Sequence, residues 1–63
     1  GRDEALRLLS VSDSALRLKA VEVLMLVKDA EAHKRVKDAV SREKDPETKV
    51  LMEKLVKSQE GGR

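Results

Sequence analysis

The chain has 63 residues, no cysteine, no aromatic residue, one histidine and a formal net charge of +2. This composition excludes disulfides and thiolate metal sites, leaves no histidine cluster for zinc, and removes aromatic platforms for nucleobase stacking. The near balance of charges gives no support on its own for binding to nucleic acid or to an anionic membrane.

Apolar residues at helical spacing predict four helices, over about residues 3–9, 13–28, 30–43 and 46–59. The first is about two turns long and must pack on another element to be stable. The second follows a turn in which either Ser12 or Asp13 serves as the N-cap. Residues 60–63 are expected to form a frayed tail because they end in Gly-Gly-Arg.

The predicted second helix is apolar on two sides. At about 100° per residue, these sides are Leu16, Ala20, Val23, Leu24 and Val27 on one hand, and Leu18, Val21 and Met25 on the other. A helix on the outside of a bundle needs only one apolar stripe. Two stripes therefore predict neighbours on two sides, as in a layered stack of helices.

The joint between the second and third helices has two interpretations. Residues 28–31 include neither glycine nor proline, so one unbroken helix reaching Glu43 is an alternative to two helices. The apolar pattern favours a break near residues 28–30, because beyond it the pattern narrows to one stripe of small residues. Asp29 then caps the third helix. The fourth helix starts more clearly, since Asp45 can cap it and Pro46 has the φ that a first helical residue needs.

Two segments of the chain match at a step of 32 residues, from Asp13 to Asp45. Each aspartate opens a helix and is followed four residues later by a base, Arg17 or Lys49. Asp45-Pro46-Glu47-Thr48-Lys49 resembles the start of the first helix of a HEAT-like (armadillo-type) repeat. The step resembles that of the short-repeat subclass seen in phycobilin-lyase-type proteins.

This resemblance implies an all-α scaffold of stacked helical hairpins that binds other macromolecules and has no catalytic residues. The first helix is then the second helix of a preceding, truncated repeat. About one and a half repeats are fewer than the roughly three that repeat arrays need. We therefore expect a fragment, a mini-domain with adapted ends, or a protomer that self-associates, for example as a homodimer.

A weak nucleic-acid-binding module is the alternative function. Lys34, Lys37 and Lys44 are expected on one side of the third helix, where they could follow phosphates. Acidic residues lie close to them on the same helix, so a solvated charged face is the simpler interpretation.

Two further groups receive structural interpretations. His33 lies at the edge of the apolar stripe of the third helix and is interpreted as a half-exposed boundary residue. Glu43, Asp45 and Glu47 cluster at the last turn, where helix capping explains them better than a divalent-cation site.

The predicted core consists of Leu8, Leu9, Leu16, Val23, Leu24, Val27, Val36, Val40, Leu51, Leu55 and Val56. Leu18, Val21 and Met25 are the predicted protein interface, either with the short first helix or with another chain. We expect them to be under-covered, with the third and fourth helices on the opposite side of the second. Met25 and Met52 are interpreted as core filler.

The sequence thus predicts a single small domain for protein–protein interaction or scaffolding, with no catalytic residue, metal or cofactor. No run approaches the ~20 apolar residues of a membrane span, and no signal peptide is visible, so a cytoplasmic protein is expected. Abundant Lys and Glu, with no Asn and one Gln, are typical of thermophile and of designed helical proteins.

Overall fold

The computed structural model describes residues 1–60, and over this range it contains helices and no strands. Its elements are α1 (Arg2–Leu8), α2 (Ser14–Met25), α3 (Ala30–Val40) and α4 (Pro46–Glu60). The prediction of four helices, with a break between the second and the third, is confirmed. The predicted frayed tail lies outside the described residues, except for Glu60 at the end of α4.

An aspartate caps each of the three longer helices. Asp13 accepts a hydrogen bond from the backbone N–H two residues later at 2.9 Å, and Asp29 accepts one from the N–H three residues later at 3.0 Å. Asp45 accepts from both the backbone N–H and the hydroxyl of Thr48, at 3.0 and 2.7 Å. Each carboxylate satisfies an N–H that the helix leaves free and interacts favourably with the helix dipole. Asp13, rather than Ser12, is the cap of α2.

The turn between α2 and α3 includes one left-handed residue. Lys28 has a φ of 50° and is the only non-glycine residue with positive φ among residues 1–60. A residue with a Cβ loses about 1–2 kcal/mol in this conformation relative to the right-handed helix. The chain therefore separates α2 from α3 without glycine, by placing local strain at Lys28.

We predict that Lys28→Gly stabilises the protein by about 0.5–1 kcal/mol, because glycine adopts positive φ freely and part of this gain is offset by its greater freedom in the unfolded chain. The melting temperature should rise by a few degrees. Lys34→Gly, at an exposed position inside α3, is the matched control and should lower stability by about 1 kcal/mol. If both variants lose stability alike, the turn is not strained.

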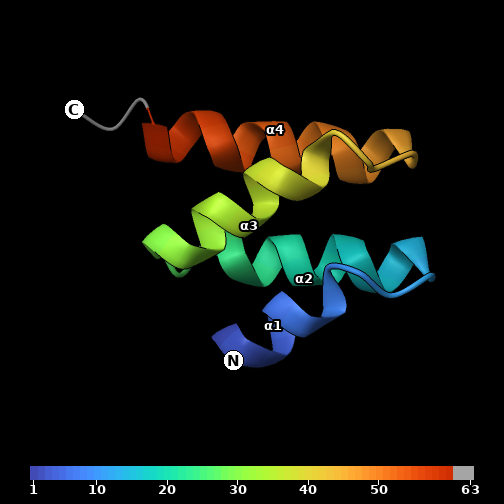
Figure 1. Cartoon of the computed structure of the whole chain (residues 1–63), viewed down its shortest axis with the longest axis horizontal. Coiled ribbons are helices and arrows are strands. Elements are labelled where there is room, and N and C mark those ends of the chain that lie inside the picture. Colours follow the sequence, from blue (N-terminus) through green and yellow to red (C-terminus); the bar gives the residue numbers. More distant parts are fainter. Residues whose placement is uncertain (61–63) are drawn as a thin grey trace.

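The helices form two antiparallel hairpins, α1–α2 and α3–α4, that lie against each other. α2 packs on both α1 and α4, and α3 packs on α4 and contacts α1. In Figure 1, α2 and α4 run in the same direction, while α1 and α3 run in the opposite sense. The expectation that the third helix lies beside the second is corrected, because the main neighbours of α2 are α1 and α4.

All four helices supply the core. Its buried apolar residues are Ala5, Leu6, Leu9, Ala20, Val21, Leu24, Ala32, Val36, Met52 and Leu55. Four other residues predicted as core pack half-buried against this cluster, namely Leu8, Val40, Leu51 and Val56.

The core prediction is wrong for three residues of the second helix and its end. Leu16, Val23 and Val27 have exposed fractions of 43%, 39% and 37%. The inward side of α2 instead centres on Val21 and Leu24, which are fully buried, because α1 and α4 cover that side. The side that the sequence assigned to the core is therefore only partly covered, since Ala20 and Leu24 of that side are buried.

Candidate functional site

A buried ion pair joins the two hairpins. Nε and Nη2 of Arg17, on α2, donate to the two carboxylate oxygens of Glu43, each at 2.8 Å. The Glu43 side chain is 2% exposed. Two parallel N–H···O bonds of this kind fix the orientation of both groups as well as contributing energy.

The remaining polar atoms of this pair also have partners. Nη1 of Arg17 donates to the carbonyls of Val11 and Ser12, at 2.8 and 2.9 Å, in the loop between α1 and α2. One Glu43 oxygen accepts from the backbone N–H of Asp45 at 3.0 Å, just before α4. Arg17 therefore ties the α1–α2 loop to the α3–α4 loop, and Glu43 is a structural group at the start of α4.

A second ion pair joins the start of one hairpin to the start of the other. Arg2, at the beginning of α1, donates to Asp29, the N-cap of α3, at 2.8 Å. Its hydrogen bond lowers the pKa of Asp29. Asp29 thus caps α3 and also holds the start of α1 through Arg2. This ion pair adds a polar link between two helices that otherwise contact each other little.

The ion pair with Arg17 also makes stability depend on pH. Its hydrogen bonds lower the pKa of Glu43 below the ordinary value of 4.5, although burial of the carboxylate acts in the opposite direction. The folded protein thus binds the proton less readily than the unfolded chain. The contribution of Glu43 is fully present above about pH 4.5 and is lost as the pH falls through the lowered pKa.

We predict that the urea midpoint falls as the pH is lowered from about 5 to about 3. Glu43→Gln should reduce the midpoint at pH 7 and flatten this decline, because glutamine does not titrate. The difference between the two proteins should shrink at low pH. An unchanged difference at both ends of the range would show that Glu43 does not carry the effect.

The predicted interface on α2 is turned inwards. Val21 is fully buried in the core, and Leu18 and Met25 are half-buried. Packing of this side on another helix of the same chain was one of the two predicted outcomes. While the fold stays intact, Val21 is not available to another chain.

The three lysines of the alternative function are all exposed, but the structure does not make them one continuous face. Lys34 and Lys37 lie on α3, whereas Lys44 lies in the loop beyond the end of this helix at Val40. Lys37 donates to Glu60 of α4 at 2.9 Å, and this bond lowers the pKa of Glu60. One of the three positive charges is therefore paired within the chain.

His33 lies at the boundary that the sequence predicted. Its side chain is 22% exposed, and its Nε2 lies 3.5 Å from the same Glu60 oxygen that Lys37 contacts. Within residues 1–60, Nε2 has no hydrogen-bond partner. His33 is thus a half-buried neighbour of a Lys–Glu pair. Ser58 lines the same depression as His33, but its hydroxyl donates to the carbonyl of Leu55 at 3.0 Å.

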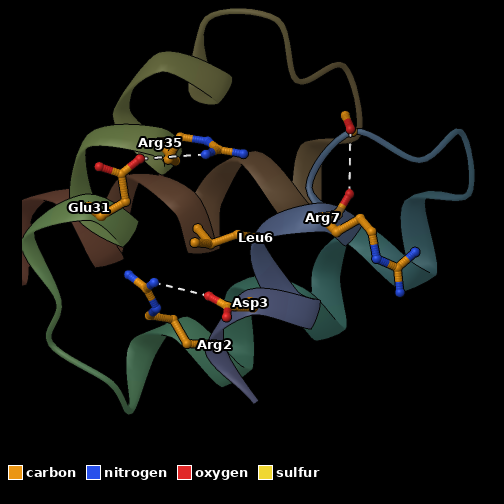
Figure 2. A pocket seen from close by; sticks show the side chains of 7 residues that line it. Arg2, Asp3, Leu6, Arg7, Glu31 and Arg35 are labelled. Carbon is orange, nitrogen blue, oxygen red and sulfur yellow. Dashed lines mark hydrogen bonds and ion pairs between the residues drawn. The ribbon is translucent and has the colours of Figure 1, made fainter.

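A depression between α1 and α3, with a cavity volume of about 770 Å³, was not predicted from the sequence (Figure 2). Its lining comprises Arg2, Asp3, Leu6, Arg7, Ser10, Glu31 and Arg35. Each arginine has a carboxylate partner: Asp3 and Asp29 for Arg2, Glu4 for Arg7, and Glu31 for Arg35. The depression is consequently mixed in charge, with a carboxylate beside each of its arginines.

The exposed apolar surface lies elsewhere, mainly on α2 and the turn that follows it. Leu26, in that turn, has an exposed fraction of 84%. Leu16, Val23 and Val27 are further exposed apolar residues of α2 and this turn. The sequence signal for this surface was the side of α2 that includes Leu16, Val23 and Val27, which the apolar pattern assigned to the core.

Comparisons with protein-family profiles, curated proteins and solved structures gave no significant match to this chain. In the part of the chain that the structure describes, no helix is both long and apolar enough to span a bilayer.

Proposed function

We propose that this chain is a non-enzymatic helical-repeat module of the HEAT-like type, which serves protein–protein interaction or scaffolding. One observation carries the proposal: the two segments related by the 32-residue step fold into α2 and α4, which pack on each other and run in the same direction (Figure 1). Each begins after a capping aspartate, and each has an antiparallel partner before it, α1 or α3.

The contacts between the hairpins support the same proposal. In repeat arrays, each unit contacts only its neighbours, through equivalent helices of successive units. Here α2 contacts α4 and α1 contacts α3, and the ion pairs Arg17–Glu43 and Arg2–Asp29 connect equivalent loops and helix starts. These contacts support a repeat unit of α1–α2 followed by α3–α4 as the alternative to a truncated repeat followed by a complete one.

The carboxylates that cap or join the helices have structural partners. Asp29, Glu43 and Asp45 have lowered pKa values, and hydrogen bonds to arginine or at a helix N-terminus account for each of them. A general acid or base needs a pKa close to the working pH, which these groups do not approach.

Photo-cross-linking can test this proposal in a cell extract of the source. The full chain would carry a photoreactive amino acid at Leu26, with an exposed position on α4, Lys54, as the control. We expect a defined protein adduct from position 26 that resists nuclease, and binding of the purified partner to the unmodified chain. Nuclease-sensitive adducts that disappear in a Lys34→Glu, Lys37→Glu, Lys44→Glu variant would instead establish nucleic-acid binding. The absence of any adduct above the control would contradict the proposal.

A further inference from the structure

Three exposed apolar residues form a ridge on one side of α2 and the turn that follows it. This α2 ridge consists of Leu16, Val23 and Val27. Leu16 and Val23 are seven residues apart and so lie along one side of α2, and Val27 follows in the turn beyond the end of α2 at Met25. Ala20 lies between them and is 1% exposed. The ridge therefore borders the core directly, and a helix laid along it would extend the core.

The internal repeat shows what occupies the equivalent side of α4. At the 32-residue step, Leu16 corresponds to Thr48 and Val23 to Leu55. Thr48 and Leu55 are fully buried, since α4 packs on α2 as well as on its own hairpin partner α3. α2 likewise packs on its own hairpin partner, α1. Among residues 1–60, however, no helix lies on the side of α2 that corresponds to the side of α4 on which α2 packs.

The outer side of α4 differs in chemistry from the side of α2 that corresponds to it in the repeat. The positions of α4 that correspond to the buried Val21 and the half-buried Met25 of α2 are Glu53 and Lys57, both exposed. Terminal units of helical arrays carry a polar outer face of this kind. The outer side of α4 thus carries two charged residues beside the exposed Val50, whereas the ridge side of α2 is apolar.

We propose that the α2 ridge is the docking face for a helical hairpin of a partner protein, whose second helix lies parallel to α2 as α2 lies beside α4. This inference rests on the proposed repeat function and adds the surface and the kind of partner. The packing of α4 on α2 is its precedent. The partner helix would present small and branched apolar residues, as α2 does to α4.

A second copy of this chain does not offer such a helix. The side of its α2 that packs on α4 is already covered, with Val21 fully buried, and the outer side of its α4 carries Glu53 and Lys57. A head-to-tail contact between copies would therefore place charges against Leu16 and Val23, which is unfavourable.

The test supplies the hairpin from the chain's own sequence. The full chain is extended at its N-terminus by a second copy of residues 1–28. At the new junction, Lys28 of the added copy is followed by Gly1, the N-cap of α1, just as Lys28 of the original chain is followed by Asp29, the N-cap of α3. Tethering gives the added hairpin a high effective concentration, so weak docking becomes measurable. Val23→Lys is then made in the original α2, both in the extended chain and in the 63-residue chain.

Val23→Lys is expected to change the melting temperature little in the 63-residue chain, where this side is open. In the extended chain it should lower the melting temperature by about 4–8 °C more. Val50→Lys is the matched control, because Val50 is 51% exposed on α4 and should be neutral in both chains.

Hydrogen exchange distinguishes the ways in which the idea can fail. If the added residues are protected but Val23→Lys acts equally in both chains, the α2 ridge is not the docking face and the repeat proposal stands. If the added residues are unprotected, stacking itself has failed and both proposals fall. If the 63-residue chain forms a concentration-dependent dimer that Val23→Lys abolishes, a second copy is the occupant and the partner hairpin is overturned.

Discussion

Glu43→Ala is expected to lower the free energy of unfolding by about 3 kcal/mol, measured by urea denaturation followed by circular dichroism. The change leaves the guanidinium of Arg17 half-enclosed without its carboxylate partner, and removing one member of a buried ion pair costs about 3–5 kcal/mol. It also removes the acceptor for the Asp45 N–H. A domain of this size has roughly 3–5 kcal/mol in total, so the variant should be only marginally stable.

Two further variants keep this prediction measurable. Glu43→Gln retains an oxygen that can accept from Arg17 or from the Asp45 N–H, so it should lose less stability and remain folded. Glu53→Ala, at an exposed position of α4, is the matched control and should stay within about 0.5 kcal/mol of the original chain. Equal effects of Glu43→Ala and Glu53→Ala would show that the ion pair does not hold the hairpins together.

The helix starts could be predicted from the sequence because their causes are local. Asp45 caps α4 through a residue three positions later, and Pro46 fits the first helical position whatever the rest of the chain does. Asp29 likewise defines the break before α3 through its own side chain. The helix ends were less predictable, since the chain leaves α2 through a strained residue, Lys28, with no glycine to mark the turn.

The inward side of α2 could not be predicted because the cause is not local. Leu16 and Leu24 are the same residue type on the same apolar side, yet one is 43% exposed and the other is fully buried. The difference in exposure is caused by the position of α4, which begins about twenty residues later in the sequence. Periodicity finds apolar sides but does not say which of two sides a later helix will cover.

The Arg17–Glu43 pair escaped prediction for a similar reason. Arg17 looks like a charge that separates two apolar stripes, and Glu43 looks like part of an acidic turn. Only the stacking of the hairpins brings them together, since they lie 26 positions apart in the chain. The usable signal was the repeat itself, which puts a base four residues after the capping aspartate in both α2 and α4.

Leu24→Ala is expected to lower stability by about 3 kcal/mol, whereas Leu16→Ala should lower it by less than about 1 kcal/mol. Leu24 is fully buried on the helix that both α1 and α4 contact, and truncating a buried leucine removes its transfer energy and leaves a cavity. Leu16 is 43% exposed, so alanine removes fewer contacts there and leaves no closed void. Both changes replace leucine by alanine within the same helix, so the difference in helix propensity affects the stability of both variants equally.

The pair Leu24→Val and Leu16→Val serves where Leu24→Ala is too unstable to measure. Each change removes one methylene, worth about 0.8 kcal/mol when buried, and adds the same β-branched penalty to the helix. The loss in urea midpoint should therefore be clearly larger at residue 24. Equal losses at residues 16 and 24 would mean that a helix already covers Leu16 in solution, as it would in a self-associated form. A molar-mass measurement across a concentration series then identifies that state, because only an associated chain changes mass on dilution.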